Sequence, residues 1–173
     1  MLVMMQIGAI EEFSGIKSKL DDAQIKEASA KFSINALVHK FSKPKSDGEI
    51  ILLLDPAHVI SRNHIQAAYS NALFSFNDNE NMSKNIGIEI MMFMSFTKQI
   101  KDAIAISGAK DNSHFVLFCS NMSALKKAQR YIKIKKEFNP SKKEQVHAAK
   151  QFGLKSYSAD SLLYKMASLK LSD

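Results

Sequence analysis

The sequence contains little of the chemistry on which several kinds of site depend. Its single cysteine, Cys119, excludes an internal disulfide and a cysteine-based zinc cluster. The six glycines lie far apart, so they form neither a dinucleotide-binding fingerprint nor a phosphate-binding loop. The five histidines show no paired metal-ligand spacing, and no Gly-x-Ser-x-Gly elbow occurs. We therefore expect no cofactor and no bound metal, and we expect Cys119 to be a small core side chain.

Long hydrophobic runs are lacking as well. The longest, over residues 86–96, falls well short of the ~20 residues that a membrane-spanning helix needs. The apolar start of the chain has no basic lead and runs directly into Glu11 and Glu12, which favours a first strand over residues 2–10 rather than a signal peptide. These features predict a soluble, cytoplasmic protein with no membrane partner.

Positive charge, by contrast, is in excess. Lys and Arg number 24 and Asp and Glu number 17, which gives a net charge of +7 over 173 residues. Such an excess favours anionic partners, such as nucleic acid or an acidic protein surface, but it is also explained as charge that keeps the protein soluble. The length and the ordinary hydrophobic share of 46% predict one compact domain over residues 1–173.

Interspersed helix and strand patterns predict an α/β (α+β) fold, in which several helices flank a small mixed or antiparallel sheet. Besides the first strand, strands are predicted over residues 34–41, 49–54, 114–119 and 133–138. Helices are predicted over residues 21–32, from Ser61 onward, and over residues 86–96, 97–108, 121–132, 140–153 and 158–171. Turn residues predict a turn over 42–48, and the polar stretch 76–85 predicts a loop.

Glu89 is a lone carboxylate in the most apolar helix of the chain. Burying it alone would be costly, so it must be paired, capped or exposed. It is either an anchor for an arginine or lysine of a partner, or a residue of the first helical turn that the helix dipole favours. The sequence leaves both readings open.

Asp55 and His58 form the most enzyme-like spot, because they follow an apolar strand at whose end an acid and a base could converge. Asp-Pro is also an ordinary way to end a strand with a turn, and the turn is the favoured interpretation. The sequence does not show whether the two side chains are neighbours.

Basic residues gather around the central pair of helices, and Phe74 and Phe76 lie near them in sequence. They could supply phosphate contacts and stacking surfaces for single-stranded RNA, or simply form a solvated basic face. The candidates are Arg62, His64, Lys84, Lys98, Lys101 and Lys110. The terminal helix raises a similar question, because its broad apolar face can be core or can dock a partner.

Several short motifs together resemble a known family. They are the lone Glu89 in its apolar helix, the segment Thr97-Lys98-Gln99-Ile100, an Ala-Ile pair, and Gly108-Ala109-Lys110-Asp111 before a strand. The pattern His64-Ile65…Ala68…Ala72 and the terminal Ala-x-Leu-x-Leu add to them. The chain resembles the TPRKB-like family, the small kinase-binding subunits of the KEOPS (EKC) complex.

The resemblance implies a non-catalytic regulatory subunit that binds the small atypical kinase/ATPase of the complex directly. It implies indirect contact with the metal-dependent transferase and the dimerising subunits, and recruitment of tRNA by its 3′ CCA tail for threonylcarbamoyladenosine formation next to the anticodon. The candidate RNA contacts for this role are the six basic residues given above, with Lys98 standing where the family often has arginine. The candidate partner contacts are Glu89, Ile100, Ile104, Leu162, Leu163, Met166 and Leu169. A small enzyme using Asp55 and His58, and a free-standing basic RNA-binding protein, remain as alternatives.

Overall fold

The computed structural model describes residues 14–42, 48–154 and 158–171. The strand predicted over residues 2–10 lies outside these ranges, as does most of the turn predicted over 42–48. Within them, every helix is too short or too polar to cross a lipid bilayer.

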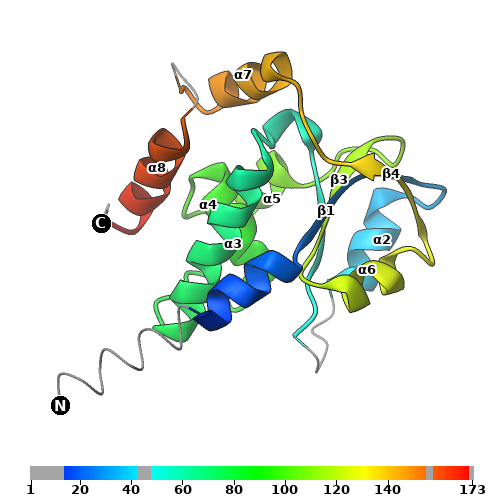
Figure 1. The fold of residues 1–173 in the computed structure, drawn as a ribbon, viewed down its shortest axis with the longest axis horizontal. Coiled ribbons are helices and arrows are strands. Elements are labelled where there is room, and N and C mark those ends of the chain that lie inside the picture. The colour runs from blue at the N-terminus through cyan, green and yellow to red at the C-terminus, as the bar shows by residue number, and fades with distance from the viewer. Residues whose placement is uncertain (1–13, 43–47, 155–157, 172–173) are drawn as a thin grey trace.

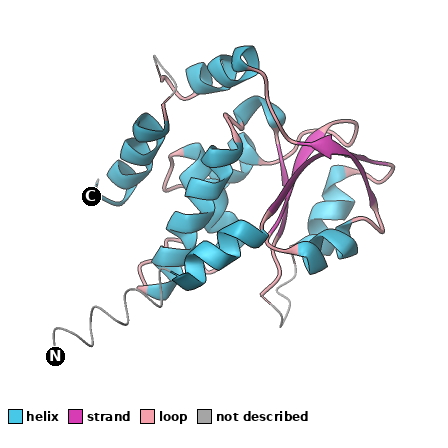
Figure 2. Cartoon of the chain, viewed as in Figure 1, coloured by secondary structure: helices cyan, strands magenta, loops and turns pink. Residues whose placement is uncertain are grey.

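The centre of the fold is an antiparallel sheet of four strands in the order β2-β3-β1-β4. The strands are β1 (Gln24–Ala30), β2 (Ile51–Leu54), β3 (Phe115–Cys119) and β4 (Ile132–Glu137). Figure 2 shows the sheet standing between two groups of helices. The predicted fold class, an α+β fold with a small sheet flanked by helices, is confirmed.

The helices lie on both faces of the sheet (Figure 1). They are a helix over residues 14–22, α2 (Ile34–Phe41), the short 3-10 helix η1 (Pro56–His58), α3 (Arg62–Asn77), α4 (Ile86–Ser95), α5 (Ile100–Ser107), α6 (Met122–Ala128), α7 (Lys142–Gln151) and α8 (Ala159–Leu171). The helices predicted from Ser61 onward are therefore confirmed, with the loop after α3 beginning only at Asp78.

Two hydrophobic cores lie on opposite faces of the sheet. Val116 and Phe118 of β3 pack into the core formed with the helix over 14–22, α3, α4 and α8. Phe115, Leu117 and Cys119 alternate with them and pack into the core formed with α2 and α6. Because both faces are covered, β3 is wholly buried and reads as a continuous apolar run.

Cys119 belongs to the second of these cores, as predicted. Cys119 is 0% exposed, and burial raises the pKa of its thiol to about 12. The thiolate, which is the reactive form, is therefore scarce at neutral pH.

Two predicted elements are wrong, because the structure exchanges helix and strand over residues 21–41. The helix predicted over 21–32 would place Ile25, Ala28 and Phe32 on one face. Ile25 and Ala28 instead belong to strand β1 and are buried in different cores, one on each face, and Phe32 is 52% exposed. The predicted strand over 34–41 is helix α2. Its N-cap is Ser33, whose hydroxyl accepts a hydrogen bond from Ala36 N–H at 3.3 Å.

The central helix pair forms as predicted, with a sharp turn between α4 and α5. Asn85 caps α4, and Phe96 ends it in the left-handed region, with φ 52° and ψ 41°. Behind the turn, the hydroxyl groups of Ser95 and Ser107 lie 2.6 Å apart and tie the two helices together. At the start of α5, Lys98 and Gln99 are exposed and Thr97 is half-buried.

Candidate functional site

His64 lies inside the protein, where it cannot contact RNA. His64 is 0% exposed, and its ring stacks on that of Phe96 with 5.6 Å between the ring centroids. The ring accepts from Ile60 N–H at Nδ1 (3.2 Å), and Nε2 lies 3.1 Å from the Met94 carbonyl, to which it must donate. Burial lowers the pKa of His64 to about 4, so the ring is neutral and carries no charge for a phosphate. The prediction that His64 contacts RNA is therefore wrong for this structure.

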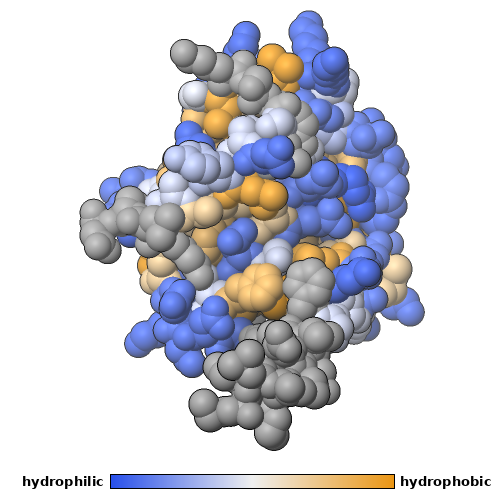
Figure 3. Space-filling model, turned by 60° about the vertical axis from the view of Figure 1, so that its left-hand side comes forward, coloured by the Kyte–Doolittle hydropathy of each residue, from blue (hydrophilic) through white to orange (hydrophobic). Residues whose placement is uncertain are grey.

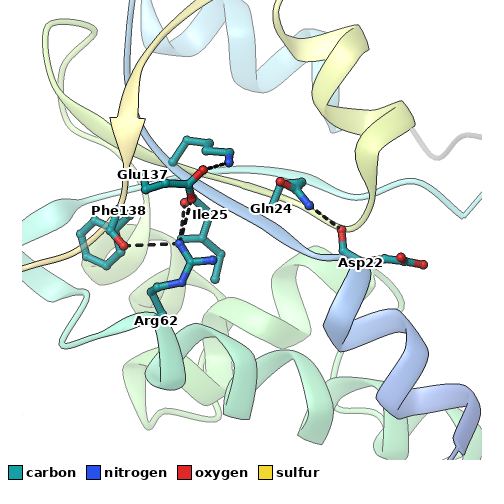
Figure 4. Close-up of polar contacts among 7 residues, drawn as sticks. Asp22, Gln24, Ile25, Arg62, Glu137 and Phe138 are labelled. Atoms are coloured by element: carbon teal, nitrogen blue, oxygen red, sulfur yellow. Dashed lines mark hydrogen bonds and ion pairs between the residues drawn. The ribbon is translucent and has the colours of Figure 1, made fainter.

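Arg62 is bound within the protein itself (Figure 4). Its guanidinium donates at 3.1 Å to a carboxylate oxygen of Glu137 and at 3.1 Å to the Ile25 carbonyl. Lys26 contacts the same carboxylate, and its hydrogen bond is the main reason that the pKa of Glu137 lies below its ordinary value. Arg62 thus fixes the start of α3 to the sheet, and a contact with RNA would compete with these bonds.

The four predicted lysines are exposed, unlike the two residues above, but they do not form one patch. Lys98 and Lys101 flank the first residue of α5, and Lys110 follows the end of that helix. We call these three the α5 lysines. Lys84 precedes α4 and lines a groove that Lys110 also lines. The Nζ atom of Lys110 donates to the Ala105 carbonyl at the C-terminal end of α5.

The N-terminus of α5 is the most suitable place for an anion beside these lysines. Its N-cap residue, Gln99, makes no capping hydrogen bond with its side chain. Free backbone N–H groups at a helix start, together with the helix dipole, attract phosphate. Asp102 lies in the same first turn and is acidic, so it opposes this attraction in part.

Hydrogen bonds within the chain satisfy the buried carboxylate of Glu89, so its burial requires no partner protein. It is 0% exposed, and its two carboxylate oxygens accept from the backbone N–H groups of Met82 (3.1 Å) and Ser83 (2.7 Å). It thereby fixes the loop that leads into α4. Glu89 lies in the first turn of α4, as the helix-dipole reading of the sequence requires, and the expected contact with a partner's cation finds no accessible oxygen here.

Only part of the apolar face of α8 is accessible. Leu162, Met166 and Leu169 are between 0% and 8% exposed. Met166 and Leu169 belong to the core that includes α3 and α4, and Leu162 belongs to a third buried cluster, with Ala148 and Ala149 of α7. The expected role of these three α8 residues as contacts for a partner is wrong in this structure, because they pack inside the chain. Leu163 is 49% exposed and Tyr164, which the sequence analysis did not single out, is 78% exposed.

Leu163 and Tyr164 form what we call the α8 face. Leu163 lines a groove of about 440 Å³ between α8, α3 and the helix over 14–22, whose walls include Asn63, Gln66 and Ser70. Figure 3, which brings this side of the molecule forward, shows hydrophobic patches bordered by hydrophilic side chains. The spacing of the three buried residues in α8 could have revealed this face, since it leaves Leu163 and Tyr164 off the buried side.

Ile100 and Ile104 lie on α5 and are 42% and 45% exposed, respectively. They are accessible, as a partner contact requires. Ile104 lines a second groove, which lies beside β2, whereas Leu163 lines the groove beside α3. The residues predicted on α5 and α8 as contacts for a partner therefore line different grooves.

Asp55 and His58 are neighbours, with Asp55 Oδ2 3.1 Å from His58 Nδ1. The other carboxylate oxygen of Asp55 accepts from Ala57 N–H at 3.0 Å and so caps η1. The favoured interpretation as a strand-ending turn agrees with this geometry. Among the described residues, no three His, Cys, Asp or Glu side chains come close enough to hold a metal ion.

Exposed apolar side chains on α8 and exposed lysines around α5 suit the chain to binding other macromolecules. A family model described as "Kinase binding protein CGI-121" matches residues 23–152. The match takes in every element from β1 to α7 and ends before α8. A comparison with curated proteins found none that matches the chain.

Proposed function

Because the chain belongs to the CGI-121 family of kinase-binding proteins, we propose that it is a non-catalytic regulatory subunit of a KEOPS complex. It binds the small atypical kinase/ATPase of that complex and recruits tRNA by the 3′ CCA tail. The family match over three quarters of the chain is the observation that carries the proposal, and the motifs around Glu89 and α5 support the assignment to KEOPS.

The α8 face is our candidate for the kinase contact. Tyr164 and Leu163, adjacent in sequence, are 78% and 49% exposed, so α8 offers accessible apolar surface beside a groove. The adjoining groove offers a place for apolar side chains of the kinase, with amide and hydroxyl groups from α3 along its wall. Tyr164 fits such a surface because tyrosine combines apolar area with a polar end.

The α5 lysines are our candidate for the tRNA contact. Lys98 and Lys101 flank a helix start without a side-chain cap, a combination that suits a phosphate of a single-stranded tail. Such contacts supply affinity without sequence selectivity, so selectivity for CCA has to come from contacts with the bases.

The mechanism that follows is positioning. By holding the tail of a tRNA and the kinase at once, the subunit raises the local concentration of the anticodon region at the transferase. Threonylcarbamoyl transfer belongs to the metal-dependent partner and ATP turnover to the kinase, so the chain itself needs no catalytic residue.

The kinase contact is tested with the double variant Leu163→Glu, Tyr164→Glu, since two carboxylates on the α8 face oppose an apolar contact. We expect its Kd for the purified small kinase, measured by calorimetry, to rise at least ~tenfold. The matched control is Val146→Glu on α7, where the original valine is 42% exposed and lies outside both grooves. Unchanged affinity in the double variant would place the kinase elsewhere, and absence of binding by the unaltered chain would refute the proposed function.

A further inference from the structure

One edge of the sheet is covered over only half of its outer strand. Gly108 forms an antiparallel bridge with Leu54, and Asp55 N–H donates to the Ser107 carbonyl at 2.9 Å, so residues 107–109 cover the second half of this edge. β2 is an edge strand, and antiparallel pairing alternates between residues that face the neighbouring strand and residues that face away. Ser120 N–H donates to the Ile50 carbonyl on the β3 side, whereas Ala109 N–H donates to the Leu53 carbonyl on the opposite side. The N–H and C=O groups of Ile51 and Leu53 therefore face away from β3. Of these four groups, only the Leu53 carbonyl has a partner among the described residues.

The two edges of the sheet differ in how they are protected. β4, at the other edge, has the sequence IKIKKE, and its exposed lysines oppose pairing with another strand. β2 has the sequence ILLL, with no charged residue and no proline. Proteins commonly protect an edge with charge or with a covering loop, and residues 107–109 cover only the second half of β2. The first half, around Ile51, has neither protection among the described residues, which is consistent with a place where a strand binds.

A groove of about 770 Å³ runs along this edge, and we call it the β2 groove. Its walls come from both helical layers, with Val38 and Phe41 of α2 on one side and Ile88 and Met91 of α4 on the other. Val38 is 46% exposed, so apolar surface is available to a ligand. A strand in this position would place its alternating side chains against the two walls.

The rim of the β2 groove is basic on balance. Lys19, Lys84 and Lys110 line it, against the acidic side chains of Asp22 and Glu49. Glu49 is paired with Lys127 of α6 at 2.5 Å, which leaves the three lysines opposed mainly by Asp22. The rim therefore favours a ligand that carries negative charge near its apolar part.

We propose that the β2 groove binds an extended segment of a partner protein, with alternating apolar residues and acidic residues beside them, as a fifth strand along the first half of β2. The unpaired backbone groups of Ile51 and Leu53 select an extended peptide, the two apolar walls select alternating apolar side chains, and the lysines select acidic flanks. This site is separate from the α8 face, and the inference does not depend on the kinase or on tRNA.

The test uses the full chain, labelled with ¹⁵N, and a synthetic peptide of about eight residues with valine and isoleucine at alternate positions and glutamates at both ends. We expect saturable binding below ~1 mM and slower hydrogen exchange at the Ile51 and Leu53 amides when the peptide is present. Methylating alternate backbone nitrogens of the peptide should abolish both effects, because it removes the N–H donors. Replacing its glutamates by lysines should weaken binding at low salt.

Two variants with matched controls locate the site. Val38→Asp should raise the Kd for the peptide at least ~tenfold, whereas Val146→Asp, at a valine of similar exposure on α7, should leave it unchanged. Lys84→Glu should raise it ~threefold at low salt, and Lys142→Glu, outside the groove, should not. Both groove variants should bind the kinase as the unaltered chain does, so failure here is distinguishable from failure of the proposed function.

Several outcomes would overturn the proposal. They are no binding at ~1 mM peptide, equal binding of the methylated peptide, and binding without protection of the Ile51 and Leu53 amides. Protection of these amides in the chain alone would assign the groove to a segment of the chain itself, and dimerisation that Val38→Asp abolishes would assign it to a second copy. Displacement of the peptide by a CCA oligonucleotide would make the groove a site for RNA.

Discussion

His64 of α3 links Ile60, in the segment before α3, to Met94 of α4 only while its ring is neutral. Ile60 N–H donates to Nδ1, so a proton on that nitrogen would remove the acceptor. Burial lowers the pKa of His64 from 6.5 to about 4, while the hydrogen bond to the Met94 carbonyl opposes the shift. The unfolded chain, with the ordinary pKa, therefore binds a proton more readily than the folded chain between these two values, and stability falls as pH falls through this window.

We predict that His64 makes the free energy of unfolding depend on pH. The loss should be roughly 2 kcal/mol between neutral pH and about pH 5, and about 3 kcal/mol in full, measured by urea unfolding at a series of pH values. His64→Gln should be less stable at neutral pH but should lack this loss. His147→Gln, at an exposed histidine of α7, should retain it. An unaltered pH dependence in His64→Gln would show that other groups cause it.

The same residue shows why the candidate RNA contacts could be predicted only in part. Charge and sequence position suggest Arg62, His64 and Lys98 equally, because a sequence shows which residues are basic and not what surrounds them. The partners of Arg62, namely Glu137 and the Ile25 carbonyl, lie 75 and 37 residues away along the chain. The acceptor of His64 on Met94 lies 30 residues away. Lys98 and Lys101 are exposed, as a contact with RNA requires, and the contact itself stays a prediction.

At the scale of elements, the predictions are correct where apolar residues recur with a clear period along one face of a helix. They are also correct where apolar residues form a continuous run in a strand that is covered on both faces. α3 begins after Ser61 and buries Ile65, Ala68 and Ala72 as its period indicates. β1 misled the prediction because it is covered on both faces by different cores, so buried residues need not follow the alternation of a half-exposed strand. α2 was mistaken for a strand although Ser33 offered a cap and Ile34, Leu37 and Phe41 follow a helical period.

A pair of glycines tests how closely α4 packs on the sheet. A Cβ atom on Gly87 of α4 would lie 2.8 Å from Leu52 Cδ2 of β2 and 3.1 Å from the capping oxygen of Asn85. We predict that Gly87→Ala lowers the free energy of unfolding by about 1 kcal/mol, because Leu52 must move within a packed core. Gly15→Ala, where a Cβ atom would meet no described atom within 4 Å, should instead raise it by about 0.5 kcal/mol.

Urea unfolding of the two alanine variants measures both changes on the same scale. Equal stabilisation by both substitutions would mean that α4 has room to move away from β2. A loss in both would mean that the helix over 14–22 is more constrained than its open surroundings indicate.

For the molecule as a whole, the net charge of +7 does not by itself identify a partner. Arg62 and Lys26 are used within the fold by Glu137, and Lys127 by Glu49. The positive charge that remains accessible at α5 adjoins a helix start, whereas the apolar surface that remains accessible lies on the α8 face. Separate surfaces of different chemistry suit a subunit that holds a protein and a nucleic acid at the same time.

We predict that the double variant Lys98→Gln, Lys101→Gln weakens tRNA binding and makes it less dependent on salt. Removing one lysine–phosphate pair should reduce the slope of log K against log salt concentration by ~0.7, and removing two should reduce it by ~1.4, as measured by fluorescence anisotropy over a salt series. Lys142→Gln, Lys143→Gln, at exposed lysines of α7, removes the same charge from the chain and should change the slope much less. Asp102→Asn, which removes the acidic side chain from the first turn of α5, should tighten binding.

A tRNA without its 3′ CCA tail distinguishes recognition of the tail from general attraction to a basic protein. We expect the unaltered chain to bind it at least ~tenfold more weakly than intact tRNA. The change in slope caused by the Lys98 and Lys101 variant should then vanish, because the phosphates that these lysines contact belong to the tail. If both lysine variants weakened both tRNAs alike, the attraction would come from net charge alone, and α5 would have no special part in binding.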